Sequence, residues 1–422
     1  MRATHRTVAV IGQGYVGLPL ALQAVRAGFQ VIGLEVDEER VRRLRRNDSY
    51  VEDVSDLDLM NASDSGRYRV TSDFADAAGF DVAIISVPTP LTDGEPDLSA
   101  VVGASAALAP LIKPGALVVL ESTTYPGTTE DVVAPLLEQG SGLTAGVDFL
   151  LGYSPERIDP GNASWTFAKT PKLVSGVNDA SRAAVQEFFD AIVDRTVAVS
   201  GTREAELAKL LENTFRSVNI ALVNETAMFA ADLGIDIWEA IRAAGTKPFG
   251  FMPFTPGPGV GGHCLPIDPI YLDWLSRERT GRSLGFVNLA NDINRGMPDY
   301  VVQRLGDALK KRDRLLADSR VLLLGLSYKA NSSDMRESPA LDVAHRLVEA
   351  GARVRAVEPG LASAPVGLDV ELAALTEEEL AAADITVLLT DHDCFDYDLV
   401  ASASQHVFDT RNRLRDRAVE RI

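Results

Sequence analysis

The first 35 residues hold a glycine pattern between two apolar runs, and this arrangement is compatible with few folds. Residues 7–11 are predicted to form a buried strand, residues 18–27 a helix, and residues 31–35 a second strand that ends on Glu35. Three glycines with the spacing G-x-G-x-x-G occupy the turn before the helix: Gly12, Gly14 and Gly17. This order of strand, turn, helix and acidic residue predicts a parallel α/β sheet that binds a dinucleotide.

Each part of this pattern has a physical task. The first glycine permits the turn, the second lets the backbone approach a pyrophosphate, and the third lets the helix pack on the strand. The helix N-terminus then faces the phosphates. Glu35 is expected to accept hydrogen bonds from the ribose hydroxyls and to repel a 2′-phosphate, which favours NAD over NADP. We count Tyr15 and Val16 of the turn, and Arg40 beyond it, among the candidate cofactor contacts.

The C-terminal part of the chain partly repeats this plan. A strand, a helix and a second strand are predicted there, over residues 320–326, 339–349 and 353–358. Residues 350–358 show the same helix end, glycine and strand as residues 27–35. The second copy lacks the full glycine pattern and carries Lys329 and Arg336 in its first loop, which suits a different anionic ligand.

The length of 422 residues is too great for one ordinary core. We therefore predict an α/β protein with two Rossmann-like, doubly wound parallel-sheet domains joined by a long central helix and a helical region. The predicted divisions are residues 1–199, 200–314 and 315–422.

Three further predicted strands of the first domain end in polar or proline-rich turns. They cover residues 81–87, 116–120 and 149–153. Ligands bind at the carboxyl ends of strands in open α/β sheets, so the residues that follow are candidate site residues. These are Pro88, Thr89, Ser122, Thr123, Glu156 and Arg157. The alternative is that they are plain turn residues, and for Ser122 both interpretations stay open.

A long helix is predicted over residues 205–233, where apolar residues recur at helical spacing. Lys209 and Asn213 lie four residues apart and therefore share one face of this helix. A lysine on a helix is usually solvated. Lys209 adjoins the apolar row, however, so a surface position and a site position stay equally open.

The loop from Pro256 to Pro269 contains one of the two cysteines of the chain. Four glycines lie within the eight positions before Cys264, and Asp268 follows four residues after it. Clustered glycine marks a turn that only glycine fits, or backbone that lies close to a ligand. Cys264 is therefore a candidate nucleophile if its thiolate is stabilised, and the alternative is a small buried hydrophobic residue.

Charge and composition argue against several kinds of partner. The formal net charge of −19 disfavours nucleic acids and anionic membranes, so an anionic substrate must be bound by local cations. Residues 7–25 are uncharged, but their glycines, proline and glutamines argue against a signal peptide or membrane span. Two distant cysteines form no disulfide framework, which fits the cytoplasm. Five histidines without ligand spacing predict no metal site.

Taken together, the motifs resemble those of the UDP-glucose/GDP-mannose dehydrogenase family over nearly the whole chain. They are Gly12-Gln-Gly-Tyr-Val-Gly17, Ser122-Thr-Thr-Tyr-Pro-Gly127, Ser154-Pro-Glu-Arg157, Glu206-Leu-Ala-Lys-Leu-Leu-Glu-Asn213, Gly261-Gly-His-Cys264 and Gly325-Leu-Ser-Tyr-Lys329 with Arg336-Glu-Ser-Pro339. The first motif is weak by itself, whereas the set is very specific.

This resemblance implies an N-terminal NAD domain, a central helical dimerisation region and a C-terminal domain that holds UDP. It implies a four-electron oxidation of the sugar C6 alcohol to a carboxylate, with two NAD⁺ consumed. By motif, Cys264 matches the nucleophile that holds the C6 aldehyde as a thiohemiacetal. A thioester then forms, which water hydrolyses.

The resemblance also carries roles for other residues. Five residues match the family's polar groups, which move protons, stabilise the oxyanion and place the water. They are Thr123, Glu156, Lys209, Asn213 and Asp268. The base role stays open between Glu156 and Asp268. The candidate substrate contacts are Glu156, Arg157, Lys209, Asn213, Phe249, Gly250, Gly257, Gly259 and Lys329. Pro88, Thr89, Ser122, Thr123 and Arg336 join the candidate cofactor contacts.

Some positions depart from the UDP-glucose type. Pro160 stands where that type has a second glutamate, and Ile267 stands where it has a lysine. Residues 155–162, 246–251 and 256–264 instead resemble the branch that acts on UDP-N-acetylhexosamines, closest to the UDP-N-acetylglucosamine 6-dehydrogenases. The manno and galacto epimers are hard to separate within that branch.

Several alternatives remain. UDP-glucose or UDP-N-acetylmannosamine are alternative substrates for the same mechanism. A two-electron alcohol dehydrogenase of the β-hydroxyacid type would share the fold plan but need no cysteine. A non-catalytic sugar-nucleotide binder is disfavoured because the nucleophile, lysine, asparagine and carboxylates are all present. We expect a cytoplasmic enzyme that forms a homodimer or a higher homo-oligomer.

Overall fold

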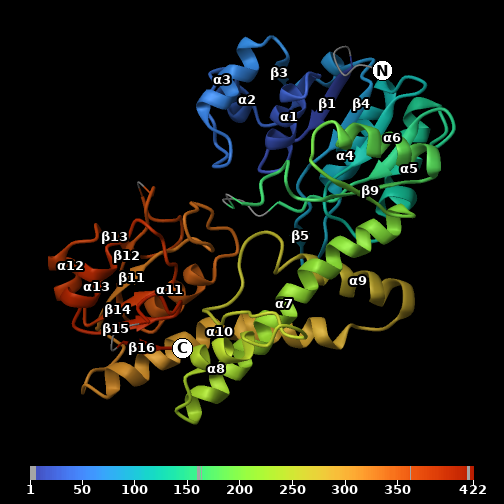
Figure 1. Cartoon of the computed structure of the whole chain (residues 1–422). Coiled ribbons are helices and arrows are strands. Elements are labelled where there is room, and N and C mark those ends of the chain that lie inside the picture. Colours follow the sequence, from blue (N-terminus) through green and yellow to red (C-terminus); the bar gives the residue numbers. More distant parts are fainter. Residues whose placement is uncertain (1–5, 159–161, 163, 362, 416–418) are drawn as a thin grey trace. The chain divides into compact units, whose positions relative to one another are not determined.

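The computed structural model describes residues 6–158, 162, 164–361, 363–415 and 419–422. The chain divides into two compact units (Figure 1). Unit 1 comprises Met1–Glu212 with Ile270–Thr280, and unit 2 comprises Asn213–Pro269 with Gly281–Ile422. The division into three domains at residues 199 and 314 stays a prediction.

Unit 1 is built on an eight-stranded sheet with the strand order β10-β9-β8-β7-β4-β1-β2-β3. Neighbouring strands pair in parallel except β8 and β9, which are antiparallel. The strands are β1 (Thr7–Ile11), β2 (Gln30–Leu34), β3 (Tyr68–Thr71), β4 (Val82–Ile85), β7 (Leu117–Leu120), β8 (Leu150–Tyr153), β9 (Lys172–Gly176) and β10 (Thr196–Ala198). A separate hairpin pairs β5 (Leu91–Thr92) with β6 (Glu95–Pro96).

Helices cover both faces of this sheet because its central strands are apolar on both sides. In β1, Val8 and Val10 join one core cluster, and Ala9 and Ile11 join the other. Helices α1 and α6 pack in the first cluster, and α4 and α5 pack in the second. The helices of unit 1 are α1 (Gly17–Arg26), α2 (Glu38–Arg45), α3 (Asp56–Asp64), η2 (Phe74–Ala77), α4 (Ser99–Leu108), η3 (Ala109–Leu111), η4 (Thr128–Val133), α5 (Ala134–Ser141) and α6 (Asp179–Asp190).

Unit 2 contains a six-stranded, fully parallel sheet with the order β13-β12-β11-β14-β15-β16. Its strands are β11 (Arg320–Leu324), β12 (Arg353–Val357), β13 (Glu371–Leu372), β14 (Ile385–Leu388), β15 (Val407–Asp409) and β16 (Glu420–Arg421). Helix α11 (Pro339–Glu349) packs on one face, and α12 (Glu377–Ala382) and α13 (Tyr397–Ala403) pack on the other. The predicted fold class, with two doubly wound sheets, is therefore confirmed.

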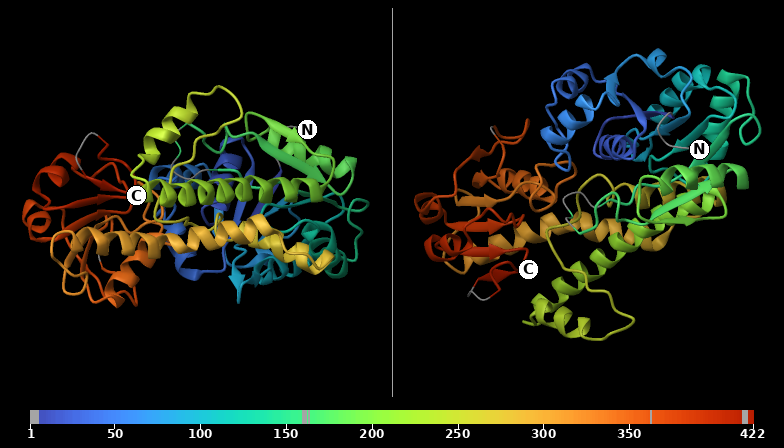
Figure 2. Two further views of the ribbon diagram at one scale, coloured as in Figure 1. Left: turned by 90° about the horizontal axis from the view of Figure 1, so that it is seen from below. Right: turned by 45° about the horizontal axis from the view of Figure 1, so that its top comes forward.

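Four further helices complete the chain. They are α7 (Thr202–Asp232), α8 (Ile237–Gly245), α9 (Asp268–Thr280) and α10 (Gly285–Lys310). The predicted long central helix is confirmed as α7, which begins in unit 1 and ends in unit 2. The second half of α7 lies beside α10 (Figure 2), and Asn224 Nδ2 donates to Asn294 Oδ1 over 3.0 Å. In the described ranges, no helix is both long and apolar enough to cross a bilayer.

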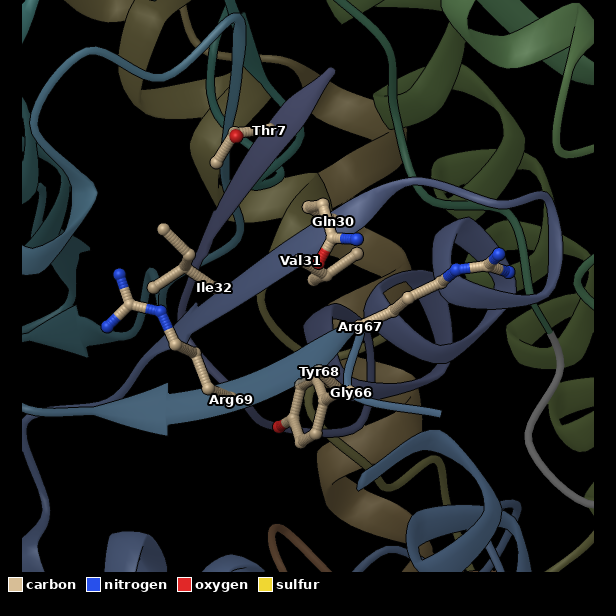
Figure 3. Close-up of a pocket in the computed structure, with 8 residues that line it drawn as sticks. All are labelled: Thr7, Gln30, Val31, Ile32, Gly66, Arg67, Tyr68 and Arg69. Atoms are coloured by element: carbon tan, nitrogen blue, oxygen red, sulfur yellow. The ribbon is translucent and has the colours of Figure 1, made fainter. Parts of the chain in front are cut away.

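A hollow of about 270 Å³ lies at the amino ends of β1, β2 and β3 in unit 1 (Figure 3). Thr7, Gln30 and Tyr68, the first residues of these strands, line it together with Arg67 and Arg69. Ligands of open parallel sheets bind at the opposite, carboxyl edge. We therefore look for the functional site at the carboxyl ends of the strands.

Candidate active site

The glycine turn after β1 has the geometry that a phosphate cradle requires. Gly12 has a φ of +90°, and a Cβ at Gly17 would lie 1.9 Å from the Gly12 carbonyl oxygen. A Cβ at Gly14 would meet no atom within 4 Å, so this backbone is open to a ligand. Among the described residues, no side chain caps the N-terminus of α1 at Val16. A diphosphate group fits this turn, because helix N-termini bind anions.

Glu35 follows β2 and is held in one orientation. Its Oε2 accepts from Gln13 N over 3.2 Å and its Oε1 accepts from Asp37 N over 3.1 Å. Arg40 Nη1 lies 3.7 Å from Glu35 Oε2, and the guanidinium stacks on the Tyr50 ring at 5.2 Å. The predicted cofactor residues Glu35 and Arg40 therefore form an ion pair at the carboxyl end of β2.

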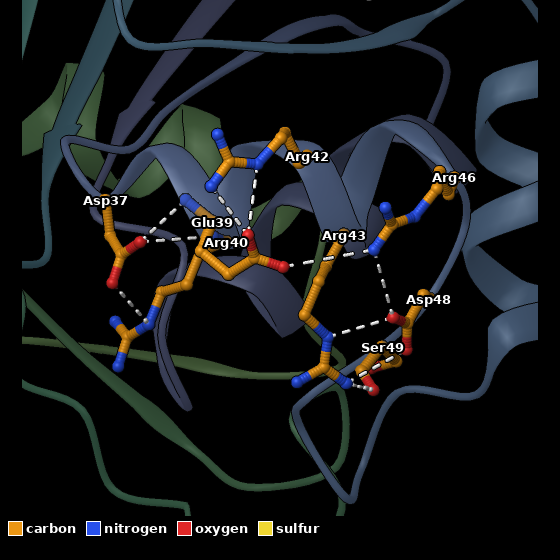
Figure 4. Close-up of polar contacts among 8 residues, drawn as sticks. All are labelled: Asp37, Glu39, Arg40, Arg42, Arg43, Arg46, Asp48 and Ser49. Atoms are coloured by element: carbon orange, nitrogen blue, oxygen red, sulfur yellow. Dashed lines mark hydrogen bonds and ion pairs between the residues drawn. The ribbon is translucent and has the colours of Figure 1, made fainter.

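Three further arginines, two in α2 and one at its C-terminal cap, are engaged locally (Figure 4). Arg42 pairs with Glu39, Arg43 pairs with Asp48, and Arg46 lies between these two acids. These ion pairs neutralise the cluster, so we do not count it as a separate anion site.

The turn after β7 is fastened to the turn after β4 by Ser122. Its Oγ accepts from Val87 N over 2.9 Å and donates to Val87 O over 2.8 Å. This geometry gives Ser122 a definite role as a turn residue. Thr89 is buried, Pro88 is exposed and Thr123 is half-buried.

Glu206 of α7 anchors the same turn. It is buried and accepts from Gly127 N, Thr129 N and Thr129 Oγ1 over 2.6, 2.9 and 2.7 Å. Burial raises the pKa of its carboxyl to about 7 although these donors oppose the shift. Sequence analysis placed Glu206 in a motif but did not identify it as the anchor of the Thr123 turn.

Glu156 belongs to a buried charge cluster that sequence analysis missed. Its Oε2 accepts from Lys172 Nζ over 2.8 Å, and the same ammonium pairs with Glu121. Burial raises the pKa of Glu121 to about 8. Burial would also raise the pKa of Glu156, but Lys172, aided by Lys209, holds it below its usual value.

The predicted residues Lys209 and Arg157 also lie in unit 1. Lys209 is only 8% exposed, so its alternative position on the solvated surface is excluded. Arg157 pairs with Glu212 of α7 over 2.7 Å, and its Nη1 donates to Pro171 O over 2.8 Å. Pro160, the first departure noted above, lies outside the described residues.

In unit 2, Cys264 is exposed in the loop that leads into α9. Its carbonyl oxygen accepts from Asp268 N over 2.8 Å. The Asp268 carboxylate is buried and accepts from Asn213 Nδ2 over 2.5 Å. The structure thus brings Asn213 to the cysteine loop, and Lys209 lies one turn before Asn213 on the same helix.

Close packing in unit 2 requires the glycines of the cysteine loop. Gly257 N donates to Asn224 Oδ1 over 3.0 Å, and Gly259 has a φ of +133°. A Cβ at Gly261 or Gly262 would lie 2.8 or 2.7 Å from the Tyr328 side chain. The cysteine loop therefore lies directly against the loop that follows β11.

The loop after β11 carries the predicted contacts Lys329 and Arg336. Arg336 pairs with Asp334 through its Nη2 over 2.6 Å, and its carbonyl oxygen accepts from Gly262 N over 3.1 Å. The predicted contacts Phe249 and Gly250 lie on an exposed segment between α8 and the cysteine loop.

Sequence analysis also missed Arg411, which follows β15. Its Nε donates to Leu389 O over 2.6 Å, and a Cβ at Gly257 would lie 3.0 Å from its Nη1. A guanidinium at the carboxyl edge of a parallel sheet suits an anionic ligand. Only its position shortly after a strand near the end of the chain could have signalled it.

Glu358 occupies in the second sheet the position that Glu35 has in the first. Its Oε2 accepts from the backbone N–H groups of Leu326 and of Ser327, the latter over 3.0 Å. His392 Nε2 lies 3.2 Å from Oε1, and the His392 and Glu358 side chains are at most 3% exposed. Within the described parts of the chain, no group of three or more acidic, histidine or cysteine side chains is placed to hold a metal ion.

Comparison with known proteins identifies three consecutive family domains. The UDP-glucose/GDP-mannose dehydrogenase NAD binding domain matches residues 6–193, the central domain matches residues 203–296 and the UDP binding domain matches residues 322–416.

Curated relatives and solved structures match most of the chain. UDP-N-acetyl-D-mannosamine dehydrogenase of Pyrococcus horikoshii is 34% identical, with 97% of this chain and 96% of the relative covered. UDP-N-acetyl-D-glucosamine 6-dehydrogenase of Pseudomonas aeruginosa is 37% identical, with 83% and 82% covered. The structure of a UDP-glucose dehydrogenase from Pyrobaculum islandicum is 29% identical, has a TM-score of 0.89 and covers 100% and 98% of the two chains.

Proposed function

Because this chain belongs to the UDP-glucose/GDP-mannose dehydrogenase family, and is thus an NAD-dependent nucleotide-sugar dehydrogenase acting on a CH–OH group, we propose that it oxidises C6 of a UDP-N-acetylhexosamine to the carboxylate. We take UDP-N-acetylglucosamine as the substrate. The observation that carries this proposal is the exposed Cys264 in a loop whose Asp268 is held by Asn213.

The relatives support the N-acetylhexosamine class. The two curated relatives named above carry the names of UDP-N-acetyl sugar dehydrogenases, whereas the Pyrobaculum structure is described as a UDP-glucose dehydrogenase. Ile267, where the UDP-glucose type has a lysine, further favours the N-acetyl branch. UDP-N-acetylmannosamine is the second candidate, since a relative of that name is similar over 97% of this chain.

The glycine turn and Glu35 would hold NAD⁺, which would supply the hydride acceptor for two oxidations at C6. The first oxidation leaves an aldehyde. Cys264 Sγ adds to its carbon, and the former carbonyl oxygen takes a proton to give a thiohemiacetal. The second oxidation leaves a thioester, which water cleaves to release the carboxylate and the thiol. The sum is one alcohol, two NAD⁺ and one water converted to one carboxylate, two NADH and three protons.

The remaining candidates support these steps by charge and position. Lys209 would stabilise the thiolate and the oxyanion, because a cation does both. Asp268, fixed by Asn213, would place the hydrolytic water. Lys329 and Arg411 would bind the anionic UDP group, which the acidic chain as a whole would repel.

We also propose that the enzyme is a cytoplasmic homodimer. Five large apolar side chains of α7 are exposed and recur on one face of the helix: Leu207, Leu211, Phe215, Leu222 and Phe229. A second copy of the chain would bury this stripe, because contiguous exposed apolar surface marks an interface.

The test is the number of NADH released per sugar nucleotide, with UDP-N-acetylglucosamine, UDP-N-acetylmannosamine and UDP-glucose supplied separately. About two equivalents from the first substrate are expected from the covalent route. Cys264→Ala should stop thioester formation, and Cys394→Ala is the matched control because both cysteines are exposed. One equivalent with free aldehyde would refute the Cys264 mechanism, and turnover of UDP-glucose alone would refute the substrate.

A further inference from the structure

We propose that Lys172 and Glu121 are positioning residues that keep Glu156 an ionised carboxylate in a fixed orientation. This inference rests on the proposed function, because Glu156 is one of the residues that match, by motif, the groups that move protons in that reaction. Neither Lys172 nor Glu121 is among the residues for which a role was predicted from the sequence.

The topology of the sheet brings these three residues together. Glu121 follows β7 directly and Glu156 lies shortly after β8, so both are at the carboxyl edge. Lys172 is the first residue of β9, and β9 runs antiparallel to β8. Tyr153 pairs with Ser175, and extending this register places Glu156 opposite Lys172. Because β9 is antiparallel to β8, its first residue, Lys172, lies at the carboxyl edge of the sheet. A parallel strand would begin at the opposite edge.

Glu156 has its acceptor capacity filled. Its Oε1 accepts from the N–H groups of Arg157 and Ile158 over 2.5 and 2.6 Å, and its Oε2 accepts from Lys172. The Glu121 carboxyl is also hydrogen-bonded to Glu156. A carboxylate group accepts about four hydrogen bonds, so these four donors fill its capacity. The side chain is 11% exposed. Glu156 is therefore held in one orientation as a fixed negative charge.

Glu121 is the more deeply buried carboxyl group. Its side chain is 0% exposed, its Oε2 accepts from no donor among the described residues, and its carboxyl is hydrogen-bonded to Glu156. One ammonium cannot neutralise two buried carboxylates, and an unpaired buried charge is very unfavourable. Glu121 therefore keeps its proton at neutral pH. The positive charge of Lys172 is then balanced by the negative charge of Glu156 alone.

The surroundings of Lys172 support this distribution of charge. The Phe167 and Phe189 rings lie 5.5 and 5.2 Å from its Nζ and favour the cation. Lys209 of α7 is a further cation that acts on Glu156. Without Lys172, burial would dominate and Glu156 would take up a proton near neutral pH.

The first test observes the proton directly by infrared spectroscopy at pH 7. The wild-type protein should show the absorption of a buried protonated carboxyl group. Glu206, whose buried carboxyl has a pKa of about 7, absorbs in the same region, so each variant is compared with the wild type by difference. Glu121→Gln should lose the absorption of one protonated carboxyl group, and Glu156→Gln should lose none. A loss of absorption in Glu156→Gln, or no loss in Glu121→Gln, would overturn the inference. Single Glu→Gln changes preserve the shape of each site, so both variants are expected to fold.

The second test follows kcat for the UDP-sugar between pH 5.5 and 9. In the double variant Glu121→Gln/Lys172→Met, Glu156 is the one carboxyl group left in this cluster and has lost its ammonium partner. The kcat of this variant should therefore fall as the pH is lowered, where the kcat of the wild type does not. We expect kcat at pH 6 to fall about 10-fold to 100-fold, in the range of general acid–base effects. Adding Glu156→Gln should abolish this pH dependence, and Lys172→Arg should restore the wild-type profile.

Lys113→Met is the matched control, since Lys113 forms an exposed ion pair with Asp81. The dissociation constant of NAD should stay unchanged in every variant. A wild-type pH profile in the double variant would contradict the positioning role. If the wild type releases two NADH per sugar while the double variant keeps the wild-type pH profile, only the present inference fails. If the wild type releases one NADH or none, the proposed function fails independently.

Discussion

The clearest prediction concerns the Glu35–Arg40 pair and the choice between NAD and NADP. Glu35→Gln removes one negative charge at the expected position of the adenine ribose and preserves the size of the side chain. Arg40 Nη1, now 3.7 Å from the carboxylate, is then released to attract a 2′-phosphate. We expect the variant to accept NADP much better than the wild type does.

The magnitude follows from the distances. Two unit charges about 4 Å apart interact by about 4 kcal/mol at an effective dielectric constant of about 20. Arg40 is 46% exposed, so solvent screening reduces this figure, and we take about 2–3 kcal/mol. That corresponds to a change of about 30-fold to 150-fold in the ratio of kcat/KM for NADP to kcat/KM for NAD. Stability should fall by about 1–3 kcal/mol, because the glutamine amide cannot accept from both backbone N–H groups.

The assay is steady-state kinetics with both cofactors at a saturating UDP-sugar concentration. Glu38→Gln, an equal loss of charge at the start of α2, is the control and should leave the ratio unchanged. Glu35→Gln/Arg40→Leu should lose the gain with NADP. An increase below about threefold in Glu35→Gln, or an equal increase in Glu38→Gln, would refute the assignment of the ribose site.

Three further predictions concern other parts of the chain. Gly17→Ala places a Cβ 1.9 Å from the Gly12 carbonyl oxygen, so denaturant titration should show a loss of at least about 2 kcal/mol, and NAD binding should weaken. Phe229→Glu puts a charge on the exposed α7 stripe and should halve the mass in light scattering, whereas an unchanged dimer mass would exclude this interface. Glu121 has a pKa of about 8 when folded and 4.5 as a reference, so the folded state holds the extra proton between these values. Stability therefore falls as pH rises across this window, and Glu121→Gln should remove up to about 1.4 kcal/mol per pH unit of that slope, as unfolding at pH 5, 6.5 and 8 would show.

The parts predicted from sequence are those with a local physical signal. Glycine spacing located the phosphate turn because the positive φ of Gly12 and the close backbone contact at Gly17 disfavour any side chain at these two positions. The helix predicted over residues 339–349 is α11, since its proline, apolar period and following glycine are all local features.

The parts that escaped prediction depend on distant pairings. Lys172 is an ordinary lysine in the sequence, and only the antiparallel pairing of β8 with β9 reveals its contact with Glu156. Burial of Lys209 could not be decided either, because a lysine beside an apolar row has no local signal that separates a site from a surface.

Glu35 follows β2 and Glu358 follows β12, so the two acids occupy equivalent positions in the two sheets. Substitutions at these two positions should nevertheless have different effects. Glu35 borders an exposed arginine, whereas Glu358 is closed off by the buried His392. In a deep mutational scan selected separately for folding and for catalysis, substitutions of Glu358 should appear mainly as losses of abundance. Substitutions of Glu35 should instead appear mainly as losses of activity per folded molecule, beside the loss of abundance expected from its two backbone hydrogen bonds. Equivalent positions in the two halves of the chain would thus be constrained by different kinds of selection.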